Sequence, residues 1–336
     1  MSKKQIFTLA IIAVFCLQVG AVLAQEPFSA EGIPPESDFV YRKHYEQVQE
    51  IMSSALAQRE AKLEAFMNKC DPKSKILQHR EAYLGQIVQE YKKAGMSAQA
   101  DALTQKMIKM FPKSDALAGQ QLKQAYDSKN WPKVIESGEK LRASSPNDPQ
   151  ILAMLAEAYS NTKNNAKLLE ISPKVVEVLG AQKAISYVVW LADHYRQKND
   201  AANASRYYEM ALGAYPSRAP QGWSASDWNA IKTAGLQLRA GAAWQREDFG
   251  AVINTYNEIL QFDPKNDGAY LFMGLSYWKM QQLDQAQVAF ARAVVLNKTN
   301  SARARQYLEQ IYKPMNNDSL EGLDKLLDKA KADLGL

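Results

Sequence analysis

Residues that end helices recur along this chain at a fixed spacing. Pro112, Pro146 and Gly180 are evenly spaced, and the two prolines each stand shortly after an apolar run. Pro216 and Pro264 stand in the same relation to the apolar runs that precede them. Proline and glycine both terminate helices, and a recurrence of roughly 20 to 50 residues indicates a repeat architecture. The chain is therefore predicted to be a row of similar units that bury a core only by stacking.

Each unit is predicted to be a pair of helices. Apolar residues recur every three or four positions and strand-like alternation is absent, so the chain is predicted to be all-α. Phasing small and aromatic residues against the terminators gives six segments of equal length: 81–114, 115–148, 149–182, 185–218, 233–266 and 267–300. Residues 219–232 form an insertion, which from Ser226 onward fits an extension of the following helix. Ser172-Pro173 is expected to interrupt the second helix of segment 149–182, because proline removes a backbone donor.

The last two segments carry the clearest packing pattern. In 267–300 the first helix holds Gly274 and Tyr277, and the second holds Ala286, Phe290 and Ala293. Segment 233–266 has similar residues at the matching offsets, namely Ala240, Ala243, Val252, Tyr256 and Ile259. Small residues let two helices approach closely, and an aromatic ring fills the gap beside them. A 34-residue period with this pattern resembles the tetratricopeptide repeat family, over about two thirds of the chain.

The resemblance implies a right-handed α-solenoid of about six helical hairpins. An N-terminal helical segment at 38–80, with a long helical stretch over 38–68, is expected to pack on the first repeat. Two further helices at 301–336 are expected to cap the other end, since the end of a solenoid requires a polar outer face. The family also implies that the first helix of each hairpin lines a concave groove that binds a partner.

On this phasing, the groove positions lie one residue after each core tyrosine and one and two turns before it. The candidate partner-binding residues are Trp190, Asp193, Arg196, Gln237, Trp244, Gln245, Leu271, Leu275, Trp278 and Lys279. Tryptophans with a polar rim are typical of binding hot spots. Trp244 and Trp278 are alternatively packing residues, set against a neighbouring helix or against Trp223 and Trp228 of the insertion. The family's clamp for a C-terminal carboxylate is not expected, because Gly, Gln and Ala occupy most of the matching positions.

The first 24 residues have the layout of a cleavable signal peptide. A short basic start precedes an apolar run from Ile6 to Val22, and Ala24 offers a small residue at the predicted cleavage site. An uncleaved membrane anchor is the alternative, although the run is short for a span. Residues 25–37 are predicted to be a flexible leader, and no later segment is apolar enough to cross a bilayer. The mature protein is therefore expected in the periplasm or outside the cell.

Charge and motif content argue against several function classes. The chain has 41 Lys and Arg against 36 Asp and Glu, and cleavage would leave a net charge of +3, which is weak for a nucleic-acid binder. His44, His79 and His194 are far apart, and motifs for phosphate binding or nucleophilic catalysis are absent. No catalytic residue, metal or cofactor is therefore expected. Cys70 would be the single cysteine left, either buried and inert or paired between chains.

These observations favour a non-enzymatic scaffold or adaptor of the bacterial cell envelope. It would bind another envelope protein or peptide in the concave groove, with no cofactor and no nucleic acid. One alternative is a protein associated with envelope glycan or lipid through its tryptophan-lined groove. Another is an enzyme with a site near the insertion at 219–232. The sequence leaves the partner and the oligomeric state open.

Overall fold

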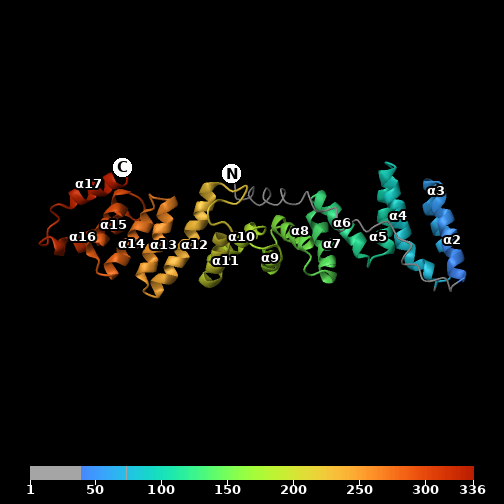
Figure 1. Cartoon of the computed structure of the whole chain (residues 1–336), viewed down its shortest axis with the longest axis horizontal. Coiled ribbons are helices and arrows are strands. Elements are labelled where there is room, and N and C mark those ends of the chain that lie inside the picture. Colours follow the sequence, from blue (N-terminus) through green and yellow to red (C-terminus); the bar gives the residue numbers. More distant parts are fainter. Residues whose placement is uncertain (1–38, 73) are drawn as a thin grey trace. The chain divides into compact units, whose positions relative to one another are not determined.

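The structure, a computed structural model, describes residues 39–72 and 74–336 (Figure 1). Within these ranges the chain forms helices joined by turns, with no β-strand. The predicted fold class, an all-α stack of helical hairpins, is confirmed. The predicted signal peptide and leader lie outside the described residues. Contacts divide the described chain into two compact units, one ending at Ile171 and one spanning Ser172–Leu336.

The first unit contains a helical N-terminal segment followed by hairpins. Its helices are α2 (Phe39–Ser53), α3 (Leu56–Met67), the short 3-10 helix η3 (Lys75–His79), α4 (Arg80–Lys93), α5 (Ser97–Met110), α6 (Asp115–Asp127), α7 (Trp131–Ser144) and α8 (Pro149–Asn161). Helices α4 and α5 pack as one pair and α6 and α7 as the next, and α7 also packs on α8. The helix α9 (Asn165–Leu179) runs across the division between the units.

The helical stretch expected over 38–68 consists of two helices. Helix α2 ends at Ser53, and α3 begins at Leu56 and packs against it. The side-chain hydroxyls of Ser53 and Ser54 donate to the carbonyls of Gln49 and Ile51 at 2.8 and 2.7 Å. Serines that bond to nearby backbone in this way compete with helix propagation, and here they stand at the end of the helix.

The second unit is a stack of three hairpins with two closing helices. Its helices are α10 (Ile185–Gln197), α11 (Ala201–Ala214), α12 (Ala225–Gln245), α13 (Phe249–Phe262), α14 (Asp267–Lys279), α15 (Leu283–Val295), α16 (Ser301–Met315) and α17 (Leu323–Asp333). Successive helices pair from α10 to α15, and both α16 and α17 pack on α15. No helix within the described ranges is long and apolar enough to cross a membrane.

One turn geometry recurs in every hairpin. At the same place in each predicted segment, one residue adopts a left-handed backbone: Gly95, Lys129, Lys163, Asn199, Glu247 and Gln281, with φ between 55° and 74°. The next residue donates its N–H to a carbonyl at the end of the first helix, as in Asp248 to Ala243 at 3.0 Å. This is the bond of a Schellman motif. The side chain of Asp248 then caps the second helix by accepting from the N–H of Ala251 at 3.0 Å. Two residues therefore end one helix and start the next.

Glycine permits the closest contact between α14 and α15. A Cβ atom placed on Gly274 would lie 2.6 Å from two ring carbons of Phe290, which is fully buried. In the first unit, a Cβ on Gly138 would lie 2.7 Å from the side chain of Leu155. Only glycine leaves room for the facing side chain at these two positions.

The prediction that Ser172-Pro173 interrupts a helix is wrong. Helix α9 continues through Pro173 to Leu179. Proline has no N–H, so the carbonyl of Leu169 lacks its usual helical donor at this point. The residues around the proline are buried, with Ile171, Ser172 and Val175 at most 1% exposed. We attribute the continuity of the helix to this burial, since tertiary packing overrides local propensity.

The insertion lengthens one helix. Helix α12 has 21 residues, whereas α10 and α14 have 13 each. It begins after Ser224, whose hydroxyl accepts from the N–H of Asp227 at 3.0 Å and caps the helix. Trp228 is 2% exposed and meets the rings of Trp223 and Tyr215 edge-on, at 6.0 and 6.1 Å between ring centroids. This aromatic cluster holds the added turns of α12 in place.

Candidate functional site

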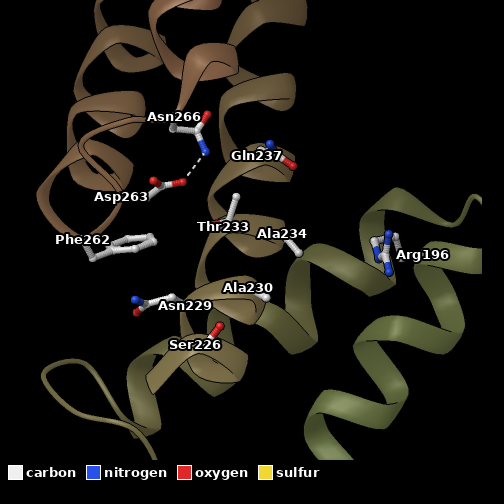
Figure 2. Close-up of a pocket in the computed structure, with 10 residues that line it drawn as sticks. All are labelled: Arg196, Ser226, Asn229, Ala230, Thr233, Ala234, Gln237, Phe262, Asp263 and Asn266. Atoms are coloured by element: carbon white, nitrogen blue, oxygen red, sulfur yellow. Dashed lines mark hydrogen bonds between the residues drawn. The ribbon is translucent and has the colours of Figure 1, made fainter. Parts of the chain in front are cut away.

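A concave pocket of about 750 Å³ lies in the second unit. It is formed by the end of α10, the N-terminal half of α12 and the turn between α13 and α14 (Figure 2). Its lining residues are Arg196, Ser226, Asn229, Ala230, Thr233, Ala234, Gln237, Phe262, Asp263 and Asn266. The α12 members follow one helix face and make the floor, with Arg196 on one side and the α13–α14 turn on the other. The volume lies within the range of roughly 300 to 1,000 Å³ typical of ligand sites.

Arg196 forms one wall and is held by two neighbours. Its Nη2 donates to Oδ1 of Asp193 at 3.2 Å, and its Nε donates to the hydroxyl of Tyr208 at 3.1 Å. The Tyr208 hydroxyl in turn donates to Asp193 Oδ1 at 2.6 Å. Burial, followed by the hydrogen bond to Asp193, raises the pKa of Tyr208 well above its usual range, so the phenol stays protonated as a donor. The guanidinium is thus oriented while its remaining N–H groups stay exposed.

The α13–α14 turn forms the other wall. Asn266 caps α14 by accepting from the N–H of Ala269 at 2.9 Å. Its Nδ2 donates to Oδ2 of Asp263 at 2.9 Å, the bond dashed in Figure 2. The ammonium of Lys232 lies 3.8 Å from the centroid of the Phe262 ring, and burial lowers the pKa of this lysine. This wall combines the Phe262 ring with polar groups, and it carries the Asp263 carboxylate with the Lys232 ammonium nearby.

Two of the predicted groove residues, Arg196 and Gln237, meet in the pocket. Asp193 is half-buried and supports Arg196 through their ion pair. Trp190 is half-buried and stacks on His194 of the same helix, with ring centroids 5.4 Å apart and planes inclined by 23°. Its exposed area is therefore limited by the histidine ring.

Trp244 and Trp278 are half-buried and pack on other aromatic rings. Trp244 meets Phe249 and Phe272 edge-on, at 5.2 and 6.5 Å between centroids. Trp278 meets Phe290 at 6.5 Å and Tyr307 at 5.8 Å. The neighbouring-helix alternative therefore describes both tryptophans, whereas the insertion tryptophans contact each other instead.

The prediction that Leu271 lines the groove is wrong. This side chain is 0% exposed and belongs to the core cluster around Phe290. Helix α14 is covered on two sides, because both α13 and α15 pack on it, and the covered surface includes Leu271. Phe272 is 36% exposed instead, Leu275 is half-buried against the same cluster, and Lys279 and Gln245 are exposed.

Sequence reasoning missed most of the pocket. Its floor extends beyond Gln237 to Ser226 and Asn229, which precede the predicted segment 233–266, and to Thr233, which begins it. The added length of α12 was the available signal, since these residues continue the face of Gln237 at helical spacing. The sequence contains no such signal for the α13–α14 wall, because its residues come close to α12 only in the folded chain.

Within the described ranges, no group of three or more His, Cys, Asp or Glu side chains is arranged to hold a metal.

In a comparison with known proteins, one family model matches part of the chain. The model of the tetratricopeptide repeat matches residues 268–300, which hold α14 and α15. No curated protein sequence matches the chain. Among solved structures, the MamA protein is 13% identical, with 56% of this chain and 94% of that chain covered and a TM-score of 0.33. Pseudomonas aeruginosa pilF is 13% identical (68% and 96% covered, TM-score 0.33), and yeast Tom70 is 14% identical (87% and 61% covered, TM-score 0.35).

The matched hairpin is representative of the others in its local geometry. Its turn at Gln281 has the same left-handed backbone and the same helix-ending hydrogen bond as the turns of the five preceding hairpins. The chain therefore contains a tetratricopeptide repeat at residues 268–300, and the turn geometry of that repeat recurs in the five preceding hairpins.

Proposed function

We propose that this protein is a non-catalytic interaction scaffold of the bacterial cell envelope, which binds a segment of another envelope protein. Tetratricopeptide repeats generally bind partner proteins or peptides. The observation that carries the proposal is the pocket on α12, which lies on the same helix face as the predicted groove residues. The envelope location rests on the predicted signal peptide.

We define the groove face as the exposed surface of α10, α12 and α14 that includes Arg196, Gln237, Gln245, Phe272 and Lys279. Phe272 is 36% exposed and stacks on a buried tyrosine of α13, with ring planes inclined by 3° and centroids 5.4 Å apart. Phe272 is held by this stack and by the edge-on contact with Trp244, and the exposed polar residues Gln245 and Lys279 belong to the same groove face. A rigid aromatic group inside a polar rim is the usual arrangement of a protein-binding hot spot.

The same aromatic contacts favour a protein over a sugar. A carbohydrate ligand would require the flat face of an aromatic ring. Trp190 has one face covered by His194, and Trp244 and Trp278 are each in contact with two further rings. The tryptophans predicted to line the groove therefore offer partly covered surfaces, whereas the polar side chains beside them are open.

Photo-crosslinking in living cells tests the groove face. A photoreactive amino acid at Gln245 or Lys279, both exposed, should trap a partner that mass spectrometry can identify. Matched controls carry the same group at Asn257 or Gln261, exposed positions on α13. The proposal requires a product from the groove positions only. Equal products from both sets, or none from the groove positions, would argue against it.

The envelope location has its own test. Osmotic-shock fractions of the producing bacterium should contain the protein, with Gln25 as its N-terminal residue. Recovery of an unprocessed chain in the cytoplasmic fraction would refute the location and leave the groove face to be judged separately.

A further inference from the structure

Four polar side chains on the floor of the pocket have no protein partner. Ser226, Asn229, Thr233 and Gln237 face the pocket from α12 (Figure 2). None of the four side chains has a hydrogen-bond partner among the residues that the structure describes, whereas the polar side chains of both walls are hydrogen-bonded to neighbours. The floor therefore offers amide and hydroxyl groups to a ligand at no loss of internal contacts.

The spacing of these groups matches an extended polypeptide. Asn229, Thr233 and Gln237 are four residues apart, which is about 6 Å along the helix axis for each step. In an extended chain, groups that point to the same side recur every two residues, or about 6.6 Å. Three alternate residues of one segment can thus each place a main-chain N–H or C=O opposite one of these side chains. Ala230 and Ala234 lie between them, and their short side chains leave space for a main chain to approach.

The charges around the pocket point to the same ligand. The floor is uncharged, and each wall carries charges of both signs: Arg196 with Asp193 on one side, and Asp263 with Lys232 beside the Phe262 ring on the other. A polymer with charges of one sign only would therefore meet like charge at either wall. A main chain of neutral amides fits the floor without conflict with either wall.

We propose that this pocket binds an extended segment of the partner protein through its main chain, with little dependence on side-chain sequence. The proposal rests on the proposed function, and it specifies which chemical groups of the partner the groove face binds. Ser226 and Asn229 belong to the insertion that lengthens α12, so the pocket is a feature of this chain rather than of its repeats.

Fluorescence anisotropy with three labelled probes tests the proposal on the full mature chain. The probes are an end-capped decapeptide of Ser, Thr, Ala and Val, a scrambled version, and a version N-methylated at every second residue. The first two should bind with affinities within about threefold of each other, and N-methylation should weaken binding at least about tenfold, because it removes main-chain donors. This comparison uses the unmodified protein and so does not depend on how a variant folds.

Variants provide the second arm. The combination Asn229→Ala, Thr233→Val and Gln237→Ala should weaken binding of the decapeptide by about tenfold or more. The matched control, Asn257→Ala with Gln261→Ala on the exposed face of α13, should leave it unchanged. Failure of the decapeptide to bind, equal binding of the N-methylated probe, or equal binding by the triple variant would each overturn the inference. Crosslinking at the groove face would still report the scaffold function in any of these cases.

Discussion

Gly274 offers the most direct test of how the matched hairpin is packed. A methyl group added at this position would stand 2.6 Å from the ring of Phe290, far inside van der Waals contact. Gly241 is also a helical glycine, in α12, but nothing lies within 4 Å of the Cβ that an alanine would place there. The same chemical change is therefore made once against a buried ring and once into open space.

The two sites differ in the sign of the expected effect. Alanine is favoured over glycine in a helix interior by about 1 kcal/mol, and this gain applies at both positions. At Gly274 it competes with overpacking, which costs about 1–3 kcal/mol when a buried group must shift. Phe290 is 0% exposed and has little space to move into. We expect Gly274→Ala to lower the free energy of unfolding by up to about 2 kcal/mol, and Gly241→Ala to raise it by about 0.5–1 kcal/mol.

Urea unfolding followed by circular dichroism measures both effects. The midpoint should fall for Gly274→Ala and rise for Gly241→Ala, with similar slopes that report an unchanged native state. Adding Phe290→Leu to Gly274→Ala should restore part of the loss, because a smaller side chain relieves the clash. A midpoint for Gly274→Ala at or above that of the unmodified protein would refute the reasoning, since it would show that the Phe290 ring can move aside with no loss of stability.

Three other substitutions test separate contacts. Trp278→Ala should lower the free energy of unfolding by about 1.5–3 kcal/mol, because it removes a half-buried ring that packs on two other aromatic rings. Unchanged thermal stability would instead assign Trp278 to ligand binding alone. Burial raises the pKa of Glu157, so its contribution to stability is present in acid and is lost as pH rises through the folded-state pKa. The stability of Glu157→Gln relative to the unmodified protein should therefore increase as the pH rises from 4 to 7. A difference between the urea midpoints of the two proteins that stays constant over this range would contradict this. Arg239→Met breaks exposed ion pairs to Glu209 and Glu258 and should cost less than about 1 kcal/mol, with the difference disappearing in high salt.

The hairpins could be predicted because their signals are local. A left-handed turn, a capping side chain and a helix stop all lie within a few residues of one another, as at Glu247 and Asp248. The pairing of Gly274 with Phe290 also follows from a short separation within one hairpin. The repeat period is the sum of these local requirements, and it is visible without knowledge of any neighbouring unit.

The groove could be predicted only in part, because its boundary depends on what the neighbouring helices cover. Leu271 and Phe272 are adjacent and both large and apolar, yet the first is buried and the second 36% exposed. A periodic pattern assigns a face to within about one residue, which is too coarse to separate them. The wall at Asp263 and Asn266 belongs to a different hairpin turn from Arg196, and their approach to α12 depends on the angle between stacked hairpins.

The left-handed turn positions also bear on how far the stability of this fold can be raised. Lys129, Lys163, Glu247 and Gln281 adopt at these turns a backbone that costs a residue with a Cβ roughly 1–2 kcal/mol and glycine nothing. Glycine makes the unfolded chain more flexible, which offsets about 0.4–1 kcal/mol of the gain. Each change to glycine should leave a net gain of about 0.5–1 kcal/mol, and sites so far apart should add. Glycine substitutions at these turns should therefore raise the thermal stability of the protein without changing the core or the groove face.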